Sequence, residues 1–195
     1  RGSEMMAISA QKNKINVAIA TWEWPSYFSP EDRLKGLTLQ TAEWRRPPAN
    51  TIPTDAKAAG LYMICTLSKH KAEKDGFTDA LMLDYEGKVA ESTGSNIFFV
   101  FNGELHTPIP HCFLDGITRQ TAISIAEKQG IKVVQRDIFP EEIKDAQEIF
   151  LTGSAVEINP VRKIDDLEFK VGKVTSMISE LYLSEVDKNY KIDNL

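Results

Sequence analysis

Lys57 is the residue whose type and surroundings point most directly to chemistry. It lies in the stretch NTIPTDAKAAGLY (residues 50–62), among small residues that leave room for a bulky partner. The pattern predicts a helix that begins just before Lys57, and a helix N-terminus disfavours a cationic amine. A lysine in such a place can act as a free amine and a nucleophile. The same position also suits a surface lysine whose ammonium group extends into water.

Glu91 is a second candidate for a chemical role. In the stretch VAESTGSNIF (residues 89–98) it stands between two apolar segments and is followed by small polar residues. A carboxylate held there could pair with a cationic ring nitrogen, because each charge favours the ionised form of the other. The alternative is a glutamate that caps a turn.

Two turns could bind an anion, LDGITR (residues 114–119) and TGSAVE (residues 152–157). The first leads into a predicted helix, so the Thr118 hydroxyl and the first free amides would face the same ligand. Ser154 adds a second hydroxyl and further amides in a turn that follows a strand. Either turn could equally be an ordinary cap or connection.

Apolar patterning predicts the elements that must position these groups. Alternating or continuous apolar segments predict strands at residues 15–22, 37–44, 80–85, 97–101, 131–136, 148–152 and 157–161. Asn102-Gly103 predicts a hairpin turn. Helical spacing predicts helices at residues 55–75, 118–129 and 174–186. The first of these helices is predicted to bury Ala56, Ala59, Met63, Ile64 and Leu67. Hairpins mixed with helices predict an α+β fold, a barrel-like mixed sheet with surrounding helices.

The composition restricts the partners and the compartment. The net charge is −5, and no apolar run approaches the roughly 18 residues of a membrane span, so we expect neither nucleic acid nor membrane as a partner. His70, His106 and His111 lack the spacing of metal ligands, so no metal site is expected. Cys65 and Cys112 form no CxxC pair, which favours buried free thiols over a disulfide or redox role and indicates a cytoplasmic protein.

Four stretches resemble a known family when they are taken in this order and spacing: NTIPTDAKAAGLY, AESTGSNIFF, LDGITRQ and FLTGSAVEINPVR. They are similar to the cofactor-lysine, pyridine-binding and phosphate-binding segments of fold-type IV pyridoxal 5′-phosphate (PLP) enzymes. WEWPSYF and WRRPPANTIP resemble the branched-chain amino acid aminotransferases in particular. The resemblance extends over nearly the whole chain and implies that the fold is the large C-terminal domain of these enzymes.

The resemblance also implies a role for each matching residue. Lys57 would bond PLP covalently and move the proton of the substrate α-carbon, and Glu91 would keep the pyridine nitrogen protonated. Tyr62 would bind the phenolic oxygen of the ring, and Leu114 would pack on the ring face. The phosphate would be bound by residues of the two turns, namely Ile117, Thr118 and Ser154.

Further implied positions concern the substrate. Ala155 would offer its amide to the substrate carboxylate, and Tyr27 and Arg46 would line the pocket or lie near it. Ser154 stands where the branched-chain enzymes usually have threonine. The hydroxyl is kept, so we expect phosphate binding to be kept as well.

The implied activity is transamination of leucine, isoleucine and valine with 2-oxoglutarate by a cytoplasmic homodimer or higher homo-oligomer. Family members carry a smaller domain ahead of this region. We therefore expect residues 1–12 to be an interdomain connection or the start of the large domain, residues 13–187 the PLP-binding C-terminal domain, and residues 188–195 a frayed tail. Such a fragment should have little activity alone. Alternatives on the same scaffold are a D-amino acid or (R)-amine transaminase, an aminodeoxychorismate lyase, and an inactive isolated domain that self-associates.

Overall fold

The computed structural model describes residues 2–23, 28–29, 31 and 35–190. Its strands are β1 (Leu37–Arg46), β2 (Asp79–Asp84), β3 (Val89–Ser92), β4 (Asn96–Phe101), β5 (Glu104–Thr107), β6 (Val133–Gln135), β7 (Glu148–Gly153), β8 (Glu157–Ile164) and β9 (Leu167–Glu168). Its α-helices are α2 (Met63–Lys74), α3 (Ile117–Lys128) and α4 (Lys173–Tyr190), and two short 3₁₀ helices are η1 (Ala59–Tyr62) and η2 (Pro140–Asp145).

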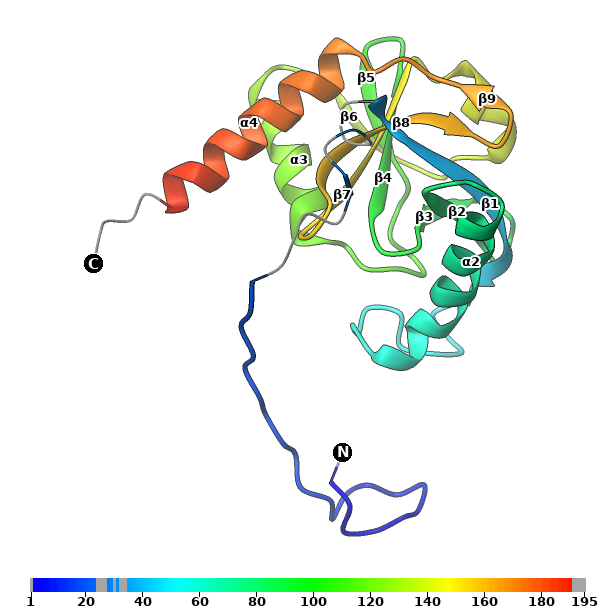
Figure 1. Ribbon diagram of the computed structural model, residues 1–195, viewed down its shortest axis with the longest axis vertical. Helices are drawn as coiled ribbons and strands as arrows, with labels where there is room; N and C mark the ends of the chain where they lie inside the picture. Colours follow the sequence, from blue (N-terminus) through cyan, green and yellow to red (C-terminus); the bar gives the residue numbers. More distant parts are fainter. Residues whose placement is uncertain (1, 24–27, 30, 32–34, 191–195) are drawn as a thin grey trace.

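The strands form one mixed sheet in the order β3-β2-β1-β8-β7-β4-β5-β6, with β9 paired to β8. β1 runs parallel to both β2 and β8, whereas β4, β7 and β8 form antiparallel neighbours. The sheet curls strongly, with α3 and α4 on one side of the molecule and α2 packed beside β1 and β2 (Figure 1). The predicted α+β fold with a barrel-like mixed sheet and surrounding helices is confirmed.

Alternating side chains in β4 supply two separate cores. Ile97 and Phe99 pack with apolar residues of β1, β2, β7 and β8. Phe98 and Val100 point to the opposite face and pack with residues of α3 and α4. This alternation follows from the pleat of a strand, in which successive side chains point to opposite faces. It makes β4 a central element, buried on both sides.

Phe98 is expected to contribute strongly to stability. It is fully buried and stacks on Phe150, with ring centroids 4.9 Å apart. Replacing it by alanine should lower the free energy of unfolding by about 3–5 kcal/mol, because a large cavity replaces the ring. Urea unfolding followed by circular dichroism would measure this. The control is Phe139→Ala at a side chain that is 47% exposed, where a change within about 0.5 kcal/mol is expected.

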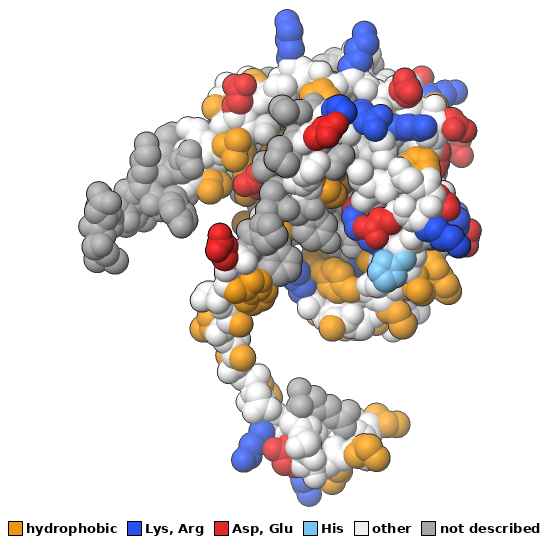
Figure 2. Space-filling view, viewed as in Figure 1, with side chains coloured by type: hydrophobic (Ala, Val, Ile, Leu, Met, Phe, Trp, Pro, Cys, Tyr) orange, Lys and Arg blue, Asp and Glu red, His pale blue; other side chains and the backbone are white. Residues whose placement is uncertain are grey.

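The strand predicted at residues 15–22 is wrong. This segment is extended but unpaired with any described strand, and it leads away from the body (Figure 1). Ile15, Val17 and Ile19 are 91%, 86% and 93% exposed, and Figure 2 shows hydrophobic side chains along this segment. β-branched residues favour an extended backbone, but a strand also needs a hydrogen-bonded neighbour.

The helix predicted at residues 55–75 begins later than expected. Residues 50–58 form turns, with the Ala56 amide donating to the Pro53 carbonyl, and α-helical structure starts at Met63. The predicted buried face is also wrong, because Met63 is 66% and Leu67 is 46% exposed. The buried residues of α2 are Cys65, Ser68 and Ala72. These small residues form the side of α2 that packs against β1 and β2. A search for large apolar residues at helical spacing does not predict such a buried face.

The remaining elements agree with the sequence, with a few exceptions. The Asn102-Gly103 turn has the positive φ angles of a tight hairpin, 51° and 79°. No strand was predicted at β3, β5 or β9. Glu91 therefore lies within a strand and not between strands. Helix α4 continues to Tyr190, into the segment predicted as a tail, and residues 191–195 lie outside the described part. None of the described helices combines the length and the hydrophobicity that a transmembrane span requires.

Candidate functional site

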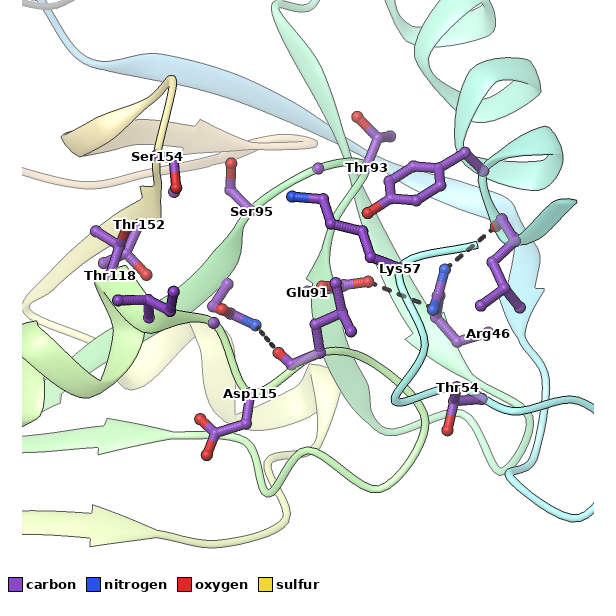
Figure 3. A pocket seen from close by; sticks show the side chains of 18 of the residues that line it. Arg46, Thr54, Lys57, Glu91, Thr93, Ser95, Asp115, Thr118, Thr152 and Ser154 are labelled. Atoms are coloured by element: carbon purple, nitrogen blue, oxygen red, sulfur yellow. Dashed lines mark hydrogen bonds and ion pairs between the residues drawn. The ribbon is translucent and has the colours of Figure 1, made fainter. Parts of the chain in front are cut away.

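One cavity brings together the segments that the sequence singled out (Figure 3). Its volume is about 260 Å³, and it lies where the loop after β1, the turn between β3 and β4, the start of α3 and the turn between β7 and β8 meet. Its lining includes seven residues predicted as site residues: Lys57, Tyr62, Glu91, Leu114, Ile117, Thr118 and Ser154. The fold therefore brings these seven positions together around one cavity.

Lys57 enters the cavity from an irregular loop. The loop is shaped by a backbone hydrogen bond from the Ala58 amide to the Ala56 carbonyl, 2.8 Å. In Figure 3 the Lys57 side chain extends into the cavity, with its amine directed towards the side that carries Ser95 and Ser154. Because α2 begins at Met63, Lys57 does not lie in the first turn of a helix, and the helix-terminus argument for its reactivity was wrong.

Glu91 is a buried carboxyl group on the cavity wall. It lies in β3, and its Oε1 is 3.4 Å from Nε of Arg46, which is itself 3% exposed. Burial raises the pKa of Glu91 to about 8, and this effect outweighs the opposing effect of the Arg46 guanidinium. Asp79 raises the pKa of Glu91 further. A second cation in the cavity would favour the ionised form of Glu91.

Arg46 lines the cavity next to Glu91. Its Nε also donates to the Cys112 carbonyl at 3.2 Å, and Nη1 donates to the Leu61 carbonyl at 3.4 Å. Next to it, burial raises the pKa of Tyr62, and the Glu91 carboxylate adds to this effect. The phenol is therefore a hydrogen-bond donor across the neutral pH range.

Glu91 is expected to make the stability of the chain depend on pH. Its folded pKa of about 8 lies above the ordinary 4.5, so the folded state binds this proton more tightly. The contribution of this proton to the free energy of unfolding is fully present below pH 4.5 and is lost as the pH rises to about 8. In Glu91→Gln this loss should disappear. Urea unfolding at a series of pH values would check it, and parallel pH profiles for both proteins would contradict it.

The two turns close the opposite side of the cavity. Gly116 is the N-cap of α3 and makes no side-chain cap, and Thr118 in the first helical turn is 6% exposed. The first amides of α3 are therefore available to an anion. Ser154 is exposed in the turn between β7 and β8. The neighbouring Thr152 hydroxyl is buried and has no hydrogen-bond partner among the described residues.

Other predicted positions have different outcomes. Arg46 lines the cavity. Ala155 is exposed in the same turn as Ser154 but is not among the described lining residues. Tyr27 lies outside the described residues. Among the described residues, no group of three or more histidine, cysteine or acidic side chains could hold a metal ion.

Sequence reasoning missed several lining residues, notably Asn96, Gly116 and Thr152. The Asn96 Nδ2 group donates to the Leu114 carbonyl at 2.9 Å, and a Cβ atom at Gly116 would lie 2.5 Å from Asn96 Oδ1. The Asn96 side chain thus holds the turn at Leu114, and it can lie this close to the backbone because Gly116 has no Cβ atom. All three residues fall inside the quoted stretches, but their packing partners come from distant segments.

Comparisons with known proteins agree with this geometry. Residues 1–164 match the family model of class IV aminotransferases. The branched-chain-amino-acid aminotransferase of Pseudomonas aeruginosa is 36% identical over 95% of this chain and 61% of its own length. A probable branched-chain-amino-acid aminotransferase of Rickettsia bellii is 40% identical over 93% of this chain and 63% of its own length. The chain therefore spans less than two thirds of these relatives.

Solved structures give the same picture. The branched-chain aminotransferase of Thermoproteus uzoniensis with norvaline has a TM-score of 0.77 at 38% identity, over 80% of this chain and 53% of that one. An aminotransferase from Brucella abortus bound to PLP has a TM-score of 0.75 at 37% identity, over 78% of this chain and 55% of that one. Because the family model matches residues 1–164, which are most of the chain, the chain belongs to the class IV aminotransferase family.

Proposed function

We propose that this chain is the PLP-binding part of a transaminase that exchanges the amino group of branched-chain L-amino acids with 2-oxoglutarate. The observation that carries the proposal is the single cavity lined by Lys57, Glu91 and the first residues of α3. The names of the relatives support the branched-chain class. Because the chain spans under two thirds of those relatives, we expect its 195 residues to have little activity alone.

The described residues fit PLP at both ends of the cavity. The Glu91 carboxyl is buried, and burial raises its pKa to about 8 despite the nearby Arg46 guanidinium. A protonated ring nitrogen next to it would be a further cation that favours the carboxylate form. At the other end, the α3 N-terminus has no side-chain cap, and the Thr152 hydroxyl has no partner within the part of the chain that the structure describes, so both offer free donors. A phosphate group is the type of acceptor that such a helix start binds.

Bound PLP would supply an electron-withdrawing ring that stabilises negative charge at the substrate α-carbon. Lys57 is proposed to bond the cofactor and then to move the α-proton with its Nζ amine, which must be neutral to accept it. Glu91 would hold the proton on the ring nitrogen. Tyr62 would donate its hydroxyl to the phenolic oxygen of the ring.

Three further groups are proposed to hold the cofactor and the substrate. Leu114 would pack on the ring face, and the phosphate would be bound by Ile117, Thr118 and Ser154. The phosphate does not react, so it would anchor the ring in one orientation relative to Lys57 and the substrate. Ala155 and Tyr27 are proposed as substrate-binding positions outside the described cavity lining.

The organisation proposed for the protein follows the same reasoning. Residues 13–187 would form the PLP-binding domain, with residues 1–12 as a connection or its start and residues 188–195 as a tail. We propose a cytoplasmic homodimer or higher homo-oligomer. Both cysteines are buried and free, which is typical of reducing compartments.

The test is amino transfer from L-leucine to 2-oxoglutarate by the protein in its longest natural form, with the 195-residue chain in parallel. Donors of both hands separate the candidates. Preference for D-amino acids or (R)-amines would identify a D-amino acid or (R)-amine transaminase and contradict the branched-chain assignment. Pyruvate release from aminodeoxychorismate would indicate the lyase. Full turnover by the 195-residue chain would contradict the expected low activity. Absence of PLP binding in both forms would support an inactive domain.

A further inference from the structure

Arg119 is the largest fully buried side chain of the described structure, at 1% exposure. It lies in the first turn of α3, and each of its three nitrogens makes a hydrogen bond. Nε donates to the Thr107 hydroxyl at 3.4 Å, and Nη1 donates to Asp115 Oδ1 at 2.6 Å. Nη2 donates to the Pro108 carbonyl at 3.1 Å and to Gln135 Oε1 at 2.8 Å.

This arrangement is poorly explained by stability alone. Burying a guanidinium is costly unless its donors are satisfied, and well-packed apolar residues often serve as well or better. Among the described residues its one acidic partner is Asp115, whose side chain is 45% exposed, so solvent weakens that ion pair. Arg119 also places a cation in the first turn of a helix, where the helix dipole disfavours it. No acidic residue lies in that first turn.

The partners of Arg119 show what the guanidinium holds in place. They lie in β5, in β6 and at both ends of the loop of residues 108–116. The same loop is tied a second time by the bond from Asn96 to the Leu114 carbonyl. Thr107 in turn donates to the Ile97 carbonyl at 2.9 Å. The loop is thus attached to three strands of the sheet, to β5 and β6 through Arg119 and to β4 through Asn96.

We propose that Arg119 is a positioning residue that holds residues 114–118 where the first amides of α3 meet an anion in the cavity. The anion also offsets the cost of a cation in the first helical turn. The identity of that anion as the PLP phosphate rests on the proposed function, whereas the positioning itself rests on the four hydrogen bonds.

Comparing PLP with pyridoxal, which has no phosphate, isolates this role. Arg119→Lys keeps the charge but cannot reach all four acceptors. It should weaken PLP binding about tenfold, because small displacements at such sites have large effects. Pyridoxal binding should change less than about twofold, because it does not use the phosphate site. Arg119→Met should lower PLP affinity at least as much. The readout is absorbance titration of the 195-residue chain, with folding checked by circular dichroism.

Arg136→Met is the matched control. Arg136 is a half-buried arginine next to β6 that binds Glu142 and His106 outside the cavity, and its loss should leave the PLP-to-pyridoxal affinity ratio unchanged. Should both Arg119 variants unfold, Gln135→Leu removes a single acceptor and should lower the same ratio more mildly. A ratio equal to that of the parent chain in the folded Arg119 or Gln135 variants would overturn the proposal.

The inference can fail separately from the proposed function. If neither the 195-residue chain nor the longest natural form binds PLP or pyridoxal, the proposed function fails, and positioning is then measured by hydrogen exchange of the amides of residues 114–118. Faster exchange there in Arg119→Lys, but not in Arg136→Met, would support the positioning role. Equal exchange in the parent chain and both variants would overturn it.

Discussion

Replacing Lys57 by alanine is expected to abolish covalent retention of PLP. The amine lines the cavity together with the groups proposed to hold the ring and the phosphate, and alanine has no nucleophile. Lys57→Arg would keep the positive charge, but a guanidinium stays protonated, so this variant should fail as well. The measurement is cofactor absorbance after borohydride reduction and gel filtration under denaturing conditions.

The control for this loss is Lys74→Ala, which removes an exposed lysine at the end of α2. This variant should retain PLP like the parent chain. Unfolding midpoints of all three variants should match the parent within a few degrees, because each changed side chain is exposed. Retention of reduced PLP by Lys57→Ala at the level of the parent would contradict the assignment of the cofactor lysine.

Glu91→Gln is expected to have the second largest effect, on turnover. The amide can accept a hydrogen bond but cannot balance a protonated ring nitrogen, so the ring would withdraw electrons less well. Turnover of leucine with 2-oxoglutarate by the natural form should fall by roughly 10²–10³, as for other losses of a fixed electrostatic partner. KM for leucine should change far less, because Glu91 is proposed to contact the ring and not the substrate.

The control is Glu104→Gln, which removes a carboxylate on β5 that pairs with Lys132 outside the cavity. This variant should keep parental turnover. Glu91→Asp keeps the charge on a shorter side chain and should fall between the parent and Glu91→Gln. Equal turnover of Glu91→Gln and the parent would contradict the role of Glu91 at the ring nitrogen, whatever the result for the Lys57 variants.

Elements with strong local patterns could be predicted from the sequence. β4 follows from its continuous run of apolar residues, the hairpin after it from Asn102-Gly103, and the end of α3 from Gly130, whose φ is 74°. In each case neighbouring residues determine the backbone conformation. The segment at residues 15–22 shows the limit, because its pattern is that of a strand but no described strand pairs with it.

The candidate site residues, Arg46 among them, were identified from short stretches, but the buried hydrogen bonds that hold Arg46 and Arg119 in place were not predicted. Arg46 and Arg119 are buried because carbonyl groups from distant segments accept their hydrogen bonds, and no local pattern reveals such acceptors. Thr54 lies just before the predicted start of the helix at residues 55–75, yet it is buried on the cavity wall because α2 begins only at Met63. Tertiary packing decides these positions.

The most direct test of the account is mass mapping of the borohydride-reduced adduct formed by the 195-residue chain with PLP. We expect one label per chain, on the peptide that contains Lys57, and loss of this label when inorganic phosphate competes at high concentration. Label spread over several exposed lysines, or located on one lysine other than Lys57, would contradict it.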